Sequence, residues 1–77
     1  MRRTKIDIIE DILKITNDGA KLTHIIYKAN LSYHLAKKYI QILLNNNLLI
    51  YMEGRYYTTD KGTIFIDQYN KLHKILL

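Results

Sequence analysis

The 77-residue chain contains no cysteine, no proline and no tryptophan, and only three glycines. Without cysteine it can form no disulfide, no thiolate metal site and no cysteine nucleophile. A chain this short buries only about 60% of the surface that its unfolded form exposes. Its stability must therefore come from dense apolar packing or from self-association. The hydrophobic content of 48% supports a packed core rather than disorder.

Long apolar runs are also missing. No stretch approaches the roughly 18 uninterrupted apolar residues that a membrane span requires. The N-terminus is basic, but Asp7, Glu10 and Asp11 interrupt the place where a secretion signal would have its apolar segment. We therefore expect an intracellular, cytoplasmic protein in which residues 1–77 form a single domain.

Acidic residues are missing from the middle of the chain. The net charge is +5, and no Asp or Glu occurs between Asp18 and Glu53. The basic and imidazole residues of that stretch are Lys21, His24, Lys28, His34, Lys37 and Lys38. A merely soluble basic surface would account for the net charge alone. An acid-free run in an otherwise mixed chain favours a face that meets a polyanion.

Catalytic and metal-binding motifs are absent from the sequence. His24, His34 and His73 are scattered, and there is no Gly-rich phosphate loop, His-Glu-x-x-His motif or cysteine pair. The acids near the N-terminus share one predicted helix, where such a group usually forms a solvated face that benefits from the helix dipole. We predict no enzymatic activity, no cofactor and no metal, and no small-molecule ligand can be inferred.

Apolar residues at three-four spacing predict helices over residues 4–16, 24–29 and 32–46. Asn17-Asp18-Gly19 ends the first helix, Lys21 and Leu22 form one extended bridge, and Thr23 caps the second helix. Ser32 caps the third helix, and Asn45-Asn46-Asn47 ends it. The residues of this third helix that we expect to face the core are Leu35, Ala36, Tyr39, Ile40, Leu43 and Leu44.

The pattern then changes to that of a β-hairpin over residues 48–58, with Glu53-Gly54 as the turn. Its tyrosines, Tyr51, Tyr56 and Tyr57, could stack on bases, but their strand positions favour packing within the hairpin. Thr59 or Asp60 caps a last helix that runs nearly to residue 77, with Gly62 weakening its first turn. The predicted fold is mainly α with a small hairpin (α+β), in the order α-(β)-α-α-β-β-α of a winged helix-turn-helix.

Separate segments of the chain carry a family resemblance. The segments Gly19-Ala20-Lys21, Tyr27 to Tyr33, Lys38-Tyr39-Ile40 and Tyr57 to Gly62 resemble archaeal winged helix-turn-helix DNA-binding proteins, including the small basic chromatin-associated dimers of Sulfolobales. Asn47 stands where that family usually has glycine, and both residues accept a positive φ. The resemblance spans roughly residues 3–73 and implies double-stranded DNA as the partner, with dimers formed through the C-terminal helix.

The third helix is the one that such a motif places in the major groove, where its N-terminal half reaches base edges. We predict that Tyr33, His34, Lys37 and Gln41 reach bases and that Ser32 and Lys38 bind phosphate. The alternative is a solvated helix face. Further backbone contacts are predicted for Lys21, Lys28 and the wing residue Arg55, which could otherwise be an ordinary hairpin charge. Residues Arg2, Arg3 and Lys5 form either a basic arm or a frayed terminus.

The helix predicted over residues 59–77 carries an apolar seam. Its members, at i, i+4, i+7 and i+11, are Phe65, Tyr69, Leu72 and Leu76. If Ile64 and Ile66 pack onto the domain, part of this seam is left for a second copy, and a homodimer follows. The alternative is that the seam folds back onto its own core.

These observations predict a sequence-specific transcriptional regulator, a repressor that occludes a promoter as a dimer. An architectural DNA-binding protein with little sequence preference is one alternative, and a winged helix used for protein interaction is another. The residue usage fits an A·T-rich genome, archaeal or viral.

Overall fold

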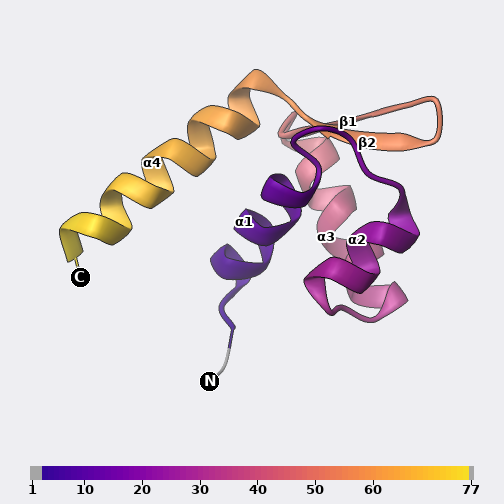
Figure 1. Ribbon diagram of the computed structural model, residues 1–77, viewed down its shortest axis with the longest axis horizontal. Helices are drawn as coiled ribbons and strands as arrows, with labels where there is room; N and C mark the ends of the chain where they lie inside the picture. The colour runs from indigo at the N-terminus through magenta and orange to yellow at the C-terminus, as the bar shows by residue number, and fades with distance from the viewer. Residues whose placement is uncertain (1–2, 77) are drawn as a thin grey trace.

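The computed structural model describes residues 3–76, except for the side chains of His73 and Leu76. Its elements are α1 (Lys5–Ile15), α2 (Leu22–Ala29), α3 (Tyr33–Asn45), β1 (Leu49–Met52), β2 (Arg55–Thr58) and α4 (Asp60–Leu76). In Figure 1 the helices α1, α2 and α3 lie together, while the hairpin projects to one side and α4 leads away on the other. The predicted winged-helix order is confirmed.

Two of the predicted helix boundaries are confirmed by their caps. At the start of α1, the Thr4 hydroxyl accepts from the Asp7 N–H, and Asp7 Oδ2 accepts from the Thr4 N–H, both at 3.1 Å. This reciprocal pair is a capping box. At the start of α3, the Ser32 hydroxyl accepts from the Leu35 N–H at 3.1 Å. Asn30 ends α2 in the left-handed region, at φ 54°, so the turn between α2 and α3 is short.

The start of α2 differs from the prediction. Thr23 lies inside the helix, and Lys21 is the N-cap residue, without a side-chain hydrogen bond. The reason is a backbone bridge one residue earlier than predicted: Ala20 pairs with Tyr56 through N–H···O bonds of 2.9 and 2.8 Å. This bridge fixes Ala20 beside β2 and leaves Lys21 extended, so the helix begins at Leu22. Ala20 thereby forms an isolated antiparallel β-bridge with β2 of the two-stranded hairpin.

The hairpin has the predicted turn. Leu49 pairs with Thr58 and Met52 with Arg55 in an antiparallel register. Glu53 and Gly54 both have positive φ, at 51° and 84°, as a two-residue type I′ turn requires. The turn lies at the tip of the hairpin, which projects from the helices (Figure 1).

Tyr56 is buried and confirms the packing interpretation for that position, and its ring centroid lies 4.8 Å from that of Tyr51. Tyr51 itself remains 59% exposed, so only part of the tyrosine cluster belongs to the core. Tyr57 is half-buried, and its ring lies so close to Gly19 that a Cβ there would be 2.4 Å from a ring carbon. Glycine is therefore favoured at position 19 for two reasons. Its φ is positive, at 93°, and the Tyr57 ring leaves no room for a Cβ.

The core forms where α1, α2 and α3 meet the base of the hairpin. Its largest fully buried apolar side chains are Ile12, Leu13, Ile25, Ile40, Leu43 and Leu49. One core prediction for α3 was wrong: Leu35 is 38% exposed. Leu35 precedes the buried Ala36 by one position and so lies about 100° around the helix from it, at the edge of the buried face rather than on it.

Candidate nucleic-acid interface

Helix α3 presents one side to the core and the opposite side to solvent. Its buried residues are Ala36, Tyr39, Ile40 and Leu43. Helical periodicity then places a stripe spaced by four, three and four residues on the far side. The stripe consists of His34, Lys38, Gln41 and Asn45, all exposed. Tyr33 and Lys37 flank it and are exposed as well, Tyr33 by 63%.

Each residue predicted to contact DNA lies at the surface. Those on or before α3 are Ser32, Tyr33, His34, Lys37, Lys38 and Gln41, and the others are Lys21, Lys28 and Arg55, all exposed. Lys21 precedes α2, Lys28 lies in the last turn of α2, and Arg55 begins β2. The fold therefore leaves all nine accessible to a ligand, distributed over the helix-turn-helix and the hairpin.

Among the described side chains, the positive charges of this surface take part in no salt bridge. Across residues 3–76, as far as they are described, the salt bridges lie near α1: Arg3 with Asp11 at 3.1 Å, and Lys14 with Glu10 at 3.4 Å. The lysines of α2 and α3 take part in neither. The acids in these two ion pairs, Glu10 and Asp11, belong to α1, and the acid-free segment between Asp18 and Glu53 supplies no carboxylate of its own to offset its lysines.

The predicted basic arm is only partly described. Arg2 lies outside the described residues. Arg3 binds Asp11 and also donates to the Asn30 carbonyl at 3.5 Å, so its guanidinium ties the N-terminus to the end of α2. Lys5 is exposed in the first turn of α1.

Two polar side chains on this surface have internal hydrogen bonds. Ser32 caps α3 through its oxygen, which leaves its O–H free to donate outward. Gln41 Nε2 donates to Asn45 Oδ1 at 2.9 Å. Asn45 is a surface residue that sequence reasoning missed, because asparagine at that position indicated only the end of the helix. The signal that could have found it is its four-residue spacing from Gln41.

The hairpin contributes charge of both signs at its tip. Arg55 is exposed opposite Met52, and Glu53 occupies the turn beside it. The exposed apolar side chains Ile50, Tyr51 and Met52 precede the turn. Arg55 is the one basic residue between residues 49 and 58, so any phosphate contact made by a charged side chain of the hairpin falls to it.

Among the described residues no helix is long and apolar enough to cross a membrane. Within the same residues, no group of three or more His, Asp or Glu side chains could hold a metal ion.

A comparison with family models matches residues 2–76 to the family described as winged helix-turn-helix. The chain belongs to the winged helix-turn-helix family. The crystal structure of Sso10a-2, a DNA-binding protein from Sulfolobus solfataricus, is similar to it with a TM-score of 0.78 and 28% identity. That similarity covers 96% of this chain and 85% of the other.

A protein from Methanocaldococcus jannaschii, MJ0290, is 34% identical over 77 residues, which are 99% of this chain. The chain spans 36% of the length of that relative. Both relatives are archaeal, and the predicted resemblance to archaeal winged-helix proteins is confirmed.

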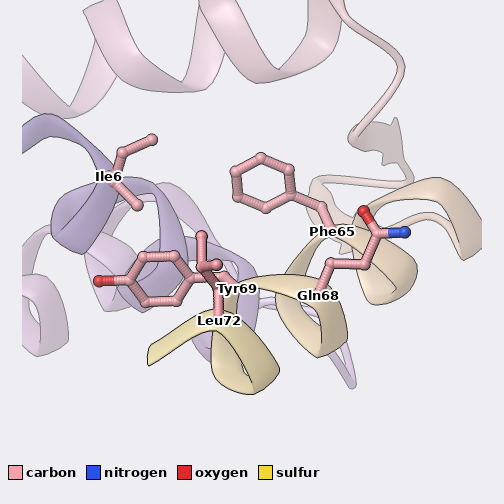
Figure 2. Close-up of a pocket in the computed structure, with 5 residues that line it drawn as sticks. All are labelled: Ile6, Phe65, Gln68, Tyr69 and Leu72. Atoms are coloured by element: carbon pink, nitrogen blue, oxygen red, sulfur yellow. The ribbon is translucent and has the colours of Figure 1, made fainter. Parts of the chain in front are cut away.

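In this winged helix, α4 forms an apolar groove with α1. Figure 2 shows Ile6 of α1 facing Phe65 and Tyr69 of α4. The groove has a volume of about 320 Å³, and Gln68 and Leu72 complete its lining. The Tyr69 hydroxyl donates to Asp7 Oδ1 at 2.8 Å, and this hydrogen bond, together with burial and the nearby carboxylates, raises the pKa of Tyr69.

The predicted seam on α4 is divided between the core and the surface. Phe65 packs against the core and Tyr69 is half-buried, whereas Leu72 is 55% exposed. The side chain of Leu76 lies outside the described residues. The expectation that Ile64 packs onto the domain was wrong, since it is 56% exposed, while Ile66 does pack there.

Proposed function

We propose that this winged helix is a sequence-specific regulator of transcription that binds double-stranded DNA as a homodimer and represses by occluding a promoter. In this proposal residues 1–77 act as one DNA-binding domain in the cytoplasm, on nucleoid DNA. The name of Sso10a-2 as a DNA-binding protein supports the choice of ligand.

The observation that carries the proposal is the exposed side of α3. It combines lysines, which form no ion pair within the described part of the chain, with imidazole, amide and hydroxyl groups, and acidic residues are absent from 19–52. Lysines attract phosphates and donate to base acceptors, and an amide side chain can both donate to and accept from base edges in the major groove. A helix placed second in a helix-turn-helix enters that groove. A solvated helix face would need no such separation of charge.

The flanking residues fit contacts to the DNA backbone. Lys21 and Lys28 lie at the two ends of α2, and Ser32 retains an O–H donor beside the start of α3. Arg55 on the wing is in a position for phosphate or for the minor groove, where an Arg side chain is favoured by the negative potential. The logarithm of the binding constant should fall linearly with the logarithm of the salt concentration, and each neutralised phosphate should make the slope more negative by about 0.9.

The dimer is proposed to form through α4. The exposed apolar side chains Ile64, Leu72 and Ile75 lie along this helix beside the α1–α4 groove. Asp60 and Asp67 occupy its first half together with Lys61, whose Nζ donates to the Asn46 carbonyl at 3.0 Å, and Lys71 and Lys74 occupy its second half. An antiparallel pair of α4 helices would bring opposite charges together, whereas a parallel pair would align like charges. A two-fold dimer would place the α3 helices on half-sites about 34 Å apart.

The test is selection of bound sequences from a random duplex pool at low and moderate salt. A regulator enriches a two-fold symmetric site and binds it about 1,000-fold or more tighter than random duplex. Retention of DNA without enrichment would contradict sequence-specific regulation and favour the architectural role. No binding to any duplex at about 50 mM salt would contradict DNA binding altogether and favour protein interaction, because a basic groove-binding protein retains nonspecific affinity there.

A further inference from the structure

The amide side chains of Gln41 and Asn45 form a hydrogen-bonded pair on the exposed stripe of α3. Gln41 Nε2 donates to Asn45 Oδ1 at 2.9 Å, with four residues between the two positions in the helix. Both residues are exposed, so water could take the place of either partner. A side-chain pair at this spacing stabilises a helix by only about 0.2–0.5 kcal/mol, so its contribution to folding is small.

The bond determines which groups of Gln41 remain available. A glutamine amide has two N–H donors and one carbonyl acceptor. With one N–H directed to Asn45, Gln41 keeps one N–H donor and Oε1, for which the described residues provide no hydrogen-bond partner. One donor beside one acceptor on a planar amide is the complement of the major-groove edge of adenine, which offers the N6 amino group and N7.

We propose that Gln41 reads an adenine in the major groove and that Asn45 is the positioning residue that holds its amide in the orientation for doing so. This inference rests on the proposed binding of duplex DNA by α3 and adds the base that one position of the helix selects. Without Asn45, the glutamine amide rotates freely and offers its donor and acceptor in either order. Binding would then lose selectivity before it loses affinity, since the lysines that attract phosphate are unchanged.

Asn45 also has a donor of its own. Its Nδ2 group takes no part in the bond to Gln41 and carries two N–H bonds, so it can bind a phosphate oxygen or a neighbouring base acceptor while Oδ1 orients Gln41. In this pair of amides, Gln41 selects the base and Asn45 positions the Gln41 amide. Such an arrangement reduces the rotational freedom that Gln41 would lose on binding.

The experiment measures the affinity for a duplex enriched from the random pool, in which each adenine in turn is replaced by 7-deazaadenine. That analogue has C–H in place of N7 and removes only the acceptor that a glutamine N–H would use. For the unmodified protein we expect one adenine per half-site at which the replacement weakens binding about tenfold, the effect of losing part of a bidentate contact. The Gln41→Ala variant should bind both duplexes equally.

The positioning role is tested by two variants of the partner. Asn45→Ala should reduce the tenfold discrimination to about threefold or less, because it removes the acceptor for Gln41 Nε2. Asn45→Asp keeps an oxygen at that place, so it should retain the discrimination even though its added charge lowers affinity for both duplexes. Asn17→Ala, at an exposed asparagine in the turn that follows α1, is the control and should match the unmodified protein.

The inference is overturned if Asn45→Ala keeps the full tenfold discrimination, or if no adenine replacement affects the unmodified protein. It is overturned as well if the pool enriches no sequence. If the protein still binds random duplex in that case, the proposed DNA binding is retained and only the selection of adenine has failed. Loss of all duplex binding in the unmodified protein would instead mean that the proposed function has failed.

Discussion

At the scale of single residues, two threonines connect the first helix to the hairpin. The Thr58 hydroxyl donates to the Leu13 carbonyl at 2.6 Å and lies 2.8 Å from the Thr16 hydroxyl, which is buried. The Thr58 N–H also donates to the Thr16 carbonyl at 3.0 Å. Leu13 lies in the last turn of α1, where carbonyls have no helical partner. These bonds therefore supply hydrogen-bond partners at the buried C-terminal end of α1 and fix the hairpin to it.

Replacing Thr58 by valine should destabilise the fold by about 1–3 kcal/mol, because the shape is kept while the Leu13 carbonyl loses its nearer donor and keeps only the Thr16 hydroxyl at 3.4 Å. In a domain of this size that corresponds to a fall in Tm of several degrees, measured by circular dichroism. Thr63→Val, at an exposed position of α4, is the matched control and should change stability by less than about 0.5 kcal/mol. Equal melting of the two variants would disprove the role of the threonine pair.

The residues of the proposed interface could be predicted from sequence to a large extent. Exposure of Lys37, Lys38 and Gln41 follows from the apolar spacing of α3, since the polar face is simply the complement of the buried one. The pairing of Gln41 with Asn45 could not be predicted, because it depends on the rotamers of both side chains. Leu35 illustrates the same limit: an apolar residue at the edge of a helix face fits the pattern whether or not a neighbour covers it.

At the scale of elements, the approach of α4 to the hairpin depends on one glycine. Gly62 is buried in the first turn of α4, and a Cβ at this position would lie 2.6 Å from the Leu48 carbonyl oxygen and from Thr58 Cγ2. Thr59 caps the same turn by accepting from the Gly62 N–H at 3.0 Å and donates to the Asn47 carbonyl at 2.7 Å. The glycine thus permits contact between backbones, although sequence reasoning treated it only as a weak helix former.

Gly62→Ala should therefore destabilise the protein, by about 1–3 kcal/mol from overpacking. An ordinary helix position would give the opposite sign, a gain of about 1 kcal/mol. Chemical denaturation measures the difference directly. A variant as stable as the unmodified protein, or more stable, would show that α4 can move away from Leu48 without cost.

The contact between α1 and α4 predicts a dependence on pH. Because the pKa of Tyr69 is raised above its usual 10.0, mainly by its hydrogen bond to Asp7, the folded protein holds this proton more tightly than the unfolded chain does. The resulting stability is fully present below about pH 10 and is lost as the pH rises through the raised pKa. The difference in free energy of unfolding between the unmodified protein and Tyr69→Phe should be constant at neutral pH and should shrink in strong alkali. A difference that grows there would contradict the assignment.

Periodicity identified α1, α3 and the hairpin because each has one face against the core. The start of α2 was missed because the backbone pairing of Ala20 with Tyr56, remote in sequence, sets it. For α4 the pattern was ambiguous. Its apolar residues, Ile64 to Ile66 and those one or two turns later, surround more than half of the helix, so spacing alone could not decide which ones face the domain.

At the scale of the whole molecule, the charged surface and the apolar surface lie on different parts of the fold. Figure 1 shows α4 leading away from α2 and α3, with the hairpin on the other side. A second copy on α4 would therefore leave the proposed DNA-binding side of α3 accessible. This separation is the reason that dimerisation and DNA binding can be tested independently.

The dimer predicts that Leu72→Glu dissociates the protein, since it places a charge on the exposed apolar part of α4. Sedimentation should give a dimer for the unmodified protein and a monomer for this variant. Thr63→Glu, on the opposite side of the same helix by its nine-residue offset, should remain dimeric. A monomeric unmodified protein at high micromolar concentration would refute the proposed interface without affecting DNA binding by α3.

The claim that the acid-free helix-turn-helix surface meets duplex DNA is tested most directly by nuclear magnetic resonance. Amide shifts of the isotope-labelled protein are followed as a random-sequence duplex is added at low salt, where nonspecific binding persists. We predict that the shifts cluster in residues 21–46 and in the hairpin turn around Arg55, and that added salt reverses them. Shifts confined to α1 and α4, or no shifts at all, would contradict the account.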